Sequence, residues 1–434
     1  MKKFWRSIED LNDSKEIERF KLREFQEGAS ELNEGVSRRD FLKFLGSTAA
    51  LAGLSGCNIR KPYYKIKPYA RKVEHSVSGI PTFYATSFQL NSAVYGVLAE
   101  THEGRPTKIE GNPTYPGTEG SSGLFQQSSI IDLYDPDRLK SPLHLTASVS
   151  LNDFKDWMLR YKKDLRKASG KGLGVLIENS LSPSFYKLVD SIRLTLPEVS
   201  FYRYDPINKD NQEQGLFNLT GNYLSPKYDL SRANVVVSFS DDFLSFGHHQ
   251  IQYSRDFADR RDPDNEFDLN RLYVFEERYT VTGAKADHHF PVKKSDLIKV
   301  LSQLAILVSR KVGFNLSSFG NISYQKLDLD FVDDKVLAAV SDDLLANRGK
   351  SLVTAGDSLD EEVHQLTFLI NSILGNNFKT VSYQEVPFSS YDFNTKSSYD
   401  SLSRLVDDLN SNKLDSVIIL GGNPVFTASQ EMGL

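Results

Sequence analysis

Beyond residue 145, short apolar runs alternate with segments of helical periodicity, and this alternation restricts the fold more than any other feature. Five runs have the length and composition of buried parallel strands. They are residues 173–178, 234–240, 272–277, 351–356 and 416–424. Alternation of strands and helices predicts a doubly wound α/β fold, here as two parallel-sheet units.

Three helices are expected between these strands. Ser182 and Pro183 are an N-cap and first-turn pair. The face that we expect this first helix to bury consists of Phe185, Leu188, Val189, Ile192 and Leu196. Ser295 and Asp296 open a second helix over 297–312, and a third covers 360–374.

The region before residue 145 has a different pattern, with alternating segments at 84–88, 95–101 and 107–110. Turn sequences separate them, which predicts a small antiparallel sheet. The expected domain organisation has five parts: a signal segment at 1–56, a cysteine and basic tether at 57–82, a small β-rich domain at 83–145, an α/β domain at 146–315, and a second, truncated α/β domain at 316–434.

Composition excludes several classes of protein. The chain has 434 residues, 39% of them apolar and 25% charged, with a net charge of −5, which favours a folded globular protein and argues against a nucleic-acid binder. Its one cysteine, Cys57, cannot form a disulfide within the chain or supply the four thiolates of an iron–sulfur cluster. No zinc-binding pattern is present in the sequence.

The segment from Ser37 to Leu54 has the pattern of an export signal. Its apolar stretch, 41–54, is too short and too weakly apolar for a permanent membrane span, and it matches the central region of a signal peptide. The run Ser-Arg-Arg-Asp-Phe-Leu-Lys resembles a twin-arginine signal, whose residues here are Arg38, Arg39, Phe41 and Leu42. A short amphipathic helix of a cytosolic domain is the alternative.

Cys57 ends the sequence Leu-Ser-Gly-Cys, which resembles a lipobox, and this predicts lipidation of Cys57. The alternative is a small buried cysteine. Residues 58–72 contain six basic residues and no acid, and they predict a tether along anionic headgroups or along a partner protein. The long charged segment 1–36 resembles the extended twin-arginine leaders of molybdenum and iron–sulfur cofactor proteins, with Phe4, Trp5, Glu24 and Phe25 at the matching places.

No catalytic motif emerges from the residues alone. Sheets of this kind bind ligands beyond the carboxyl ends of their strands, where we expect 238–249 and 421–424 to lie. The two glycines of 421–424 would permit close approach to a phosphate or pterin, or simply form a tight turn. Two adjacent histidine pairs, His248–His249 and His288–His289, cannot readily share one metal, and we expect solvated loop histidines.

Four sequence strings, at 103–116, 127–143, 277–296 and 419–427, resemble the molybdopterin oxidoreductase superfamily in order and spacing. The resemblance implies a molybdopterin oxidoreductase-like scaffold. In active members a cluster-binding cysteine lies between the first and second strings, but here that stretch has none, and no cysteine is available to bind molybdenum. A serine or aspartate ligand remains open. The resemblance therefore implies a scaffold without molybdopterin, metal or catalytic residues in this region.

The leader and the segment after Cys57 resemble the molybdopterin oxidoreductase-like iron–sulfur subunit of bacterial alternative complex III, a membrane quinol oxidoreductase. This resemblance implies a non-catalytic scaffold that positions an iron–sulfur domain, with clusters in a C-terminal part beyond Leu434. It implies multihaem cytochrome c and quinol-binding membrane subunits as partners, and a lipid-anchored position on the periplasmic face of the inner membrane. The alternative is a molybdenum enzyme of the polysulfide or tetrathionate reductase type.

Overall fold

The computed structural model describes residues 77, 79–90, 93–264, 269–316, 332–386 and 397–433. All of these residues belong to one unit, His75–Leu434. Arg38, Arg39, Phe41, Leu42 and Cys57 lie outside the described residues, so the export signal and the lipidation site remain predictions.

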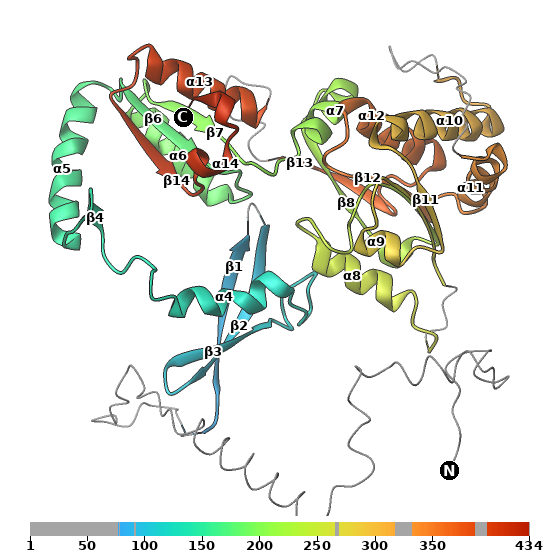
Figure 1. The fold of residues 1–434 in the computed structure, drawn as a ribbon, viewed down its shortest axis with the longest axis horizontal. Coiled ribbons are helices and arrows are strands. Elements are labelled where there is room, and N and C mark those ends of the chain that lie inside the picture. Colours follow the sequence, from blue (N-terminus) through green and yellow to red (C-terminus); the bar gives the residue numbers. More distant parts are fainter. Residues whose placement is uncertain are drawn as a thin grey trace, which may run out of the picture. The chain divides into compact units, whose positions relative to one another are not determined.

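The first described elements form the predicted antiparallel sheet, in the order β1–β2–β3 (Figure 1). The strands are β1 (Thr82–Leu90), β2 (Ala93–His102) and β3 (Arg105–Gly111). Glu103 and Gly104 make the β2–β3 turn with positive φ angles, which glycine adopts without strain. Helix α4 (Leu124–Tyr134) packs on β3 and is followed by the short pair β4 (Leu143–His144) and β5 (Ala147–Ser148).

A three-stranded parallel sheet has the order β14–β6–β7. Its strands are β6 (Leu173–Ile177), β7 (Ser200–Arg203) and β14 (Ser416–Leu420). The helices of this part are α5 (Leu151–Lys167), α6 (Pro183–Thr195) and α13 (Ser398–Asn410), and the short α14 (Pro424–Thr427) follows β14. Two predictions fail here. Leu188 of α6 is 55% exposed, and the last residues of β14, Ile419 and Leu420, are 48% and 46% exposed, so this strand is not fully buried.

The second parallel sheet has the order β11–β10–β9–β12. It consists of β9 (Val235–Phe239), β10 (Arg271–Glu276), β11 (His288–Pro291) and β12 (Ser351–Ala355). Alternate residues of these strands enter two different cores, because successive side chains point to opposite faces of a sheet. The sheet is therefore buried on both faces, as the continuous apolar runs predicted.

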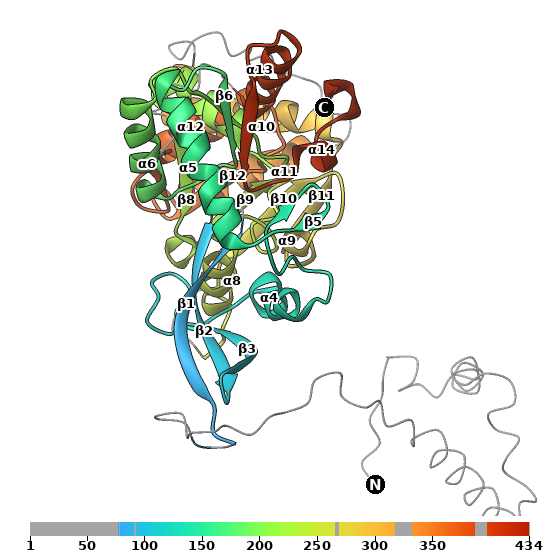
Figure 2. The same cartoon turned by 90° about the vertical axis from the view of Figure 1, so that its left-hand side faces the viewer.

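The larger core lies between this sheet and the helices α10 (Lys294–Val312), α11 (Asp334–Ala346) and α12 (Glu361–Leu374). The other face packs on α8 (Gln250–Asp259), on the 3₁₀ turn η1 (Leu230–Arg232) and on the antiparallel pair β8 (Leu224–Tyr228) and β13 (Val381–Glu385). Helix α7 (Asp210–Thr220) packs against α12. Figure 2 shows the same elements after a turn of 90°. No helix in the described ranges combines the length and apolarity that a membrane crossing requires.

The two parallel sheets are interleaved in the sequence. Strand β12 pairs with β9, and β14 pairs with β6, so residues on both sides of position 316 contribute to each sheet. The mixed α/β class, with a small N-terminal antiparallel sheet and two parallel sheets, is confirmed.

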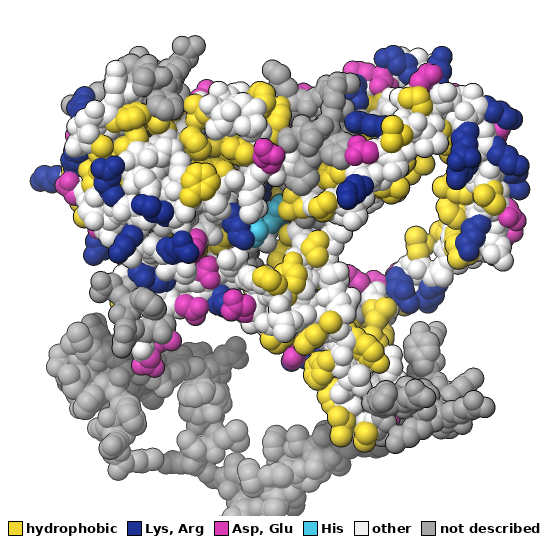
Figure 3. All heavy atoms as spheres, turned by 180° about the vertical axis from the view of Figure 1, so that it is seen from behind, with side chains coloured by type: hydrophobic (Ala, Val, Ile, Leu, Met, Phe, Trp, Pro, Cys, Tyr) yellow, Lys and Arg dark blue, Asp and Glu magenta, His cyan; other side chains and the backbone are white. Residues whose placement is uncertain are grey.

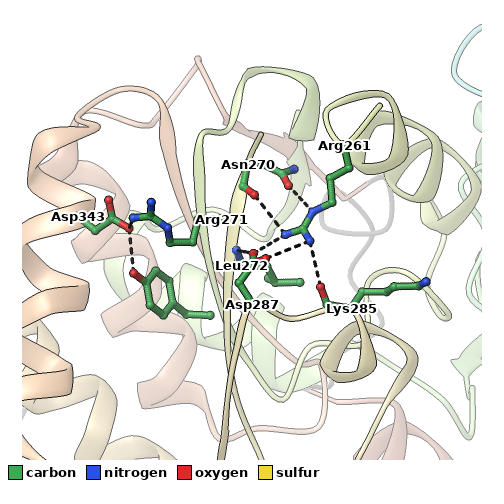
Figure 4. A network of polar contacts seen from close by, with 8 residues as sticks. Arg261, Asn270, Arg271, Leu272, Lys285, Asp287 and Asp343 are labelled. Carbon is green, nitrogen blue, oxygen red and sulfur yellow. Dashed lines mark hydrogen bonds and ion pairs between the residues drawn. The ribbon is translucent and has the colours of Figure 1, made fainter. Parts of the chain in front are cut away.

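A polar network anchors the start of β10 (Figure 4). The Arg261 guanidinium donates to the side-chain oxygen of Asn270 at 2.7 Å and pairs with the carboxylate of Asp287. The same carboxylate accepts the backbone N–H of Leu272 at 2.7 Å. Close by, Asp343 of α11 accepts from Arg271 at 2.7 Å and from the Tyr273 hydroxyl at 3.0 Å. These contacts hold β10 in register between α8 and α11.

Candidate functional site

A two-lobed cleft lies at the carboxyl ends of strands from both parallel sheets. Its first lobe has a volume of about 470 Å³ and its second of about 480 Å³. Both lobes share wall residues after β7, around Lys209, and in the loop before α8, around His248. Figure 3 shows histidine side chains in a hollow with hydrophobic and charged groups around it. This position matches the prediction that 238–249 would lie at a ligand-binding edge.

Close backbone packing at the ends of β9 and β12 builds the floor of the second lobe. The N–H of Gly356 donates to the carbonyl of Phe239 at 2.9 Å. A Cβ on Gly356 would lie 2.1 Å from the carbonyl oxygen of Ser240, a backbone atom that cannot rotate away. The glycine therefore lets the two strand ends meet, which brings Asp357 and Asp241 into the same lobe.

The charged groups in the cleft wall are mostly carboxyls. The residues concerned are Asp205, Glu213, Asp241, Asp242, Asp357 and Glu385, with Lys209 and Arg278 as the basic ones. Lys209 lies 3.9 Å from the Asp357 carboxylate, and Thr282 donates to Asp242 through both its backbone N–H and its hydroxyl. The described wall thus holds more acidic than basic groups.

Burial and mutual repulsion change the protonation of these carboxyls. Burial, and then the neighbouring charge of Asp357, raises the pKa of Asp241 to about 7. Burial raises the pKa of Glu213 to about 8, against the opposing effect of Arg203. The pKa of Asp205 is also raised, first by burial. At neutral pH the cleft therefore retains protons on groups that are ionised in water.

His248 and His249 lie in a loop before α8, as predicted, but the cleft wall surrounds them and both are half-buried. Burial lowers the pKa of His248 to about 3 and that of His249 to about 4, so both rings are neutral at pH 7. The Tyr95 hydroxyl of β2 donates to the His248 carbonyl at 3.1 Å, which ties this loop to the small sheet.

The other histidine pair lies on strand β11 instead of in a loop, with His288 exposed and His289 half-buried. The His289 ring is 3.0 Å from the fully buried carboxylate of Glu276 and stacks on Tyr279. His288 stacks on Tyr273. These histidines pack structurally beside β10, away from the cleft wall.

The segment Gly421–Pro424 does not line either lobe. Both glycines have positive φ angles, and a Cβ on either would meet the carboxylate of Glu178. Asn423 caps α14 by accepting the N–H of Phe426. The segment is therefore a tight turn, which is one of the two alternatives that the sequence left open.

Sequence reasoning missed most of the polar residues that define the cleft. Lys209, Gln212 and Glu213 belong to the start of α7, and the short strand before it, β7, was not predicted. One signal was available: Asp357 follows Gly356 at the end of the apolar run 351–355, which is a strand end.

The described cleft wall does not fit a molybdopterin cofactor. Such a cofactor carries phosphate, whose oxygens need basic side chains or free backbone N–H groups. The described wall instead presents six carboxyls and the neutral His248 and His249 to that volume, against Lys209 and Arg278 as its basic side chains. Within the described ranges, no group of three or more histidine, cysteine, aspartate or glutamate side chains has a geometry that could hold a metal ion.

Comparisons with known proteins place this α/β chain near molybdopterin proteins. No protein-family model matches the chain. It is 22% identical over 274 residues to the molybdopterin-containing subunit of an arsenate respiratory reductase from Shewanella sp. strain ANA-3, covering 59% of this chain and 31% of that protein. It is 29% identical over 116 residues to the molybdopterin-binding-like subunit of a menaquinone reductase from Nitratidesulfovibrio vulgaris, covering 25% of this chain and 16% of that protein.

Among solved structures, acetylene hydratase from Pelobacter acetylenicus gives a TM-score of 0.47 at 12% identity, covering 68% of this chain and 44% of that one. The chain spans about a third or less of the length of the two curated relatives. The sequence similarities show distant homology to molybdopterin-containing reductase subunits, without pointing specifically to alternative complex III.

Proposed function

We propose that the protein is a non-catalytic, molybdopterin-enzyme-like scaffold subunit of a membrane quinol oxidoreductase of the alternative complex III type. The observation that carries this proposal is the cleft wall, in which Asp241 and Asp357 at strand ends and Glu213 on α7 place carboxyls where a phosphate-bearing cofactor would need basic groups. A scaffold of this kind positions an iron–sulfur domain and packs against multihaem cytochrome c and quinol-binding membrane subunits.

The membrane-complex part of the proposal has separate support. One distant relative is named as a menaquinone reductase subunit and as molybdopterin-binding-like. The twin-arginine pattern at Arg38 and Arg39 and the lipobox at Cys57 agree with a place on the periplasmic face of the inner membrane. In this proposal the iron–sulfur clusters belong to polypeptide beyond residue 434.

Elemental analysis and intact mass of the full-length native protein test the proposal. We expect iron without molybdenum, and a polypeptide that begins at a lipidated Cys57. Stoichiometric molybdenum would contradict the scaffold and favour the alternative, a molybdenum-dependent oxidoreductase. That alternative draws on the similarity to the molybdopterin-containing subunit of arsenate reductase.

The lipid anchor has its own test, the Cys57→Ser variant. We expect this variant to lose the lipid and its membrane retention, with the α/β fold intact, because Cys57 lies outside the compact unit that starts at His75. Unchanged retention of the variant in a strain that lacks the partner subunits would contradict the anchor.

A further inference from the structure

We propose that the cleft binds a basic segment of a partner polypeptide, with lysine or arginine side chains entering between the carboxyl groups of Asp241, Asp357 and Glu213. This inference rests on the proposed function, because a cleft filled by a pterin cofactor would have no room for such a segment. It assigns to the cleft a cationic ligand, opposite in charge to a phosphate-bearing cofactor.

The first argument is the charge of the wall. Six carboxyl residues line the two lobes, against Lys209 and Arg278. Lys209 is 3.9 Å from Asp357, a long contact for an ion pair, and it shares that neighbourhood with Asp241. A cationic group from outside would therefore meet carboxyls that the described part of the chain compensates only in part.

The second argument is that two of these carboxyls retain protons at neutral pH, mainly because they are buried. Asp241 faces Asp357, Asp242 and Lys209, and the hydroxyls of Tyr228 and Tyr253 are near it. Glu213 faces Arg203, Asp210, Lys209 and Asp357. Their pKa values, about 7 and about 8, are raised mainly by burial. A bound cation favours the ionised form, so its binding should release protons.

The third argument is Gln212, which is 3% exposed and whose side chain lies in the wall of the second lobe. Its amide nitrogen donates to Asp357 at 3.4 Å, which fixes the orientation of the amide. The amide oxygen is left without a hydrogen-bond partner among the described residues. An N–H donor that enters beside Asp357 would satisfy a buried acceptor that otherwise costs about 1–3 kcal/mol.

The apolar lining of the first lobe favours a side chain on a peptide over a small free cation. The first lobe also exposes apolar side chains beside the acids, among them Leu181, Ile207 and Phe246. Lysine and arginine bury their alkyl stems along apolar surface while the charged head finds an acid. Guanidinium groups in addition match carboxylate oxygens in a bidentate geometry.

Calorimetry on the full-length protein tests the inference. The probe is a nine-residue peptide that alternates arginine and leucine, with capped ends, and the control peptide has citrulline at each arginine. We expect the arginine peptide to bind at 50 mM salt and to lose affinity at 500 mM salt. Binding at pH 7.5 should release protons, which is measured by comparing the binding enthalpy in two buffers of different ionisation enthalpy. Absence of binding, or equal binding of the citrulline peptide, would overturn the inference.

Variants locate the binding. Asp241→Asn combined with Asp357→Asn should weaken binding at least tenfold and reduce proton release. Asp164→Asn, which removes an exposed carboxylate on α5, should change neither. Thermal unfolding of each variant checks its fold. Equal affinity in the double variant would place the peptide elsewhere and overturn the inference.

Two further measurements distinguish a partner segment from a small polycation, and failure of this inference from failure of the proposed function. Spermine that binds as tightly as the peptide would identify the ligand as a small polycation, which contradicts a partner segment. The molybdenum content of the same sample is measured alongside. A molybdenum-free protein that binds no peptide refutes this inference alone, whereas a molybdenum-loaded protein refutes the proposed function as well.

Discussion

The Asn371 side chain should hold the free edge of β12, the strand that carries Asp357 into the cleft. Its amide oxygen accepts the backbone N–H of Val353 at 3.0 Å, and its amide nitrogen donates to the Val353 carbonyl at 2.8 Å. Among the described strands β12 pairs only with β9, so this one side chain takes the place of a second strand at Val353. Both residues are buried, and Asn371 is 1% exposed.

Replacing Asn371 with alanine leaves the buried N–H and carbonyl of Val353 without partners, and also the buried Asn376 amide nitrogen, which donates to Asn371 at 3.0 Å. Each of these three groups costs about 1–3 kcal/mol, so the expected loss is about 3–9 kcal/mol. At about 2–4 °C per kcal/mol, even the smallest of these losses should lower the melting temperature by about 6 °C or more. Circular dichroism during heating measures the fall, and hydrogen exchange of the Val353 amide should accelerate.

Asn218→Ala is the matched control, because it removes an exposed asparagine of α7 that donates to Glu361 at 2.9 Å. We expect a change within about 0.5 kcal/mol. A melting temperature for Asn371→Ala that is as close to wild type as that of this control would refute the role assigned to the β12 edge.

Three further predictions concern the cleft and its support. Asp210→Ala should lower the free energy of unfolding, measured by thermal unfolding, by about 3–5 kcal/mol. The Asp210 carboxylate lies 3.3 Å from the buried Arg203 guanidinium, which would lose this charge partner. Gly356→Ala should cost about 1–3 kcal/mol by forcing the ends of β9 and β12 apart, and unchanged stability would contradict the close contact with Ser240. The pKa of Glu213 is about 8 in the folded protein, so stability that depends on its protonated form is lost as pH rises from about 4.5 through 8. Glu213→Gln should therefore raise the melting temperature more at pH 8.5 than at pH 5. An equal effect at both pH values would contradict the raised pKa.

Uninterrupted apolar runs made most strands of the parallel sheets predictable from the sequence. Strands β9, β10 and β12 lie within a residue or two of their predicted positions, because burial on both faces leaves a continuous apolar signal. Strand β14 has the same signal but an exposed edge, since sequence does not reveal which neighbours a strand acquires. Strands β7 and β11 escaped prediction because arginine, histidine and proline interrupt their short runs.

The cleft was only partly predictable. The stretch 238–249 indicated its position, because a polar loop after a buried strand marks the ligand-binding edge of a parallel sheet. Its acidic character depends on residues that the fold gathers from four separate segments, represented by Asp205, Glu213, Asp241 and Asp357. The glycines at 421–422 matched a cofactor-binding pattern and serve a turn, because Glu178 occupies the space beside them.

Release of pterin from the full-length native protein tests the central claim most directly. The purified protein is denatured and oxidised, and the fluorescence of any released pterin is measured against an active molybdopterin enzyme treated in parallel. An acidic cleft that does not hold the cofactor predicts no pterin above the blank. One pterin per polypeptide would contradict the account.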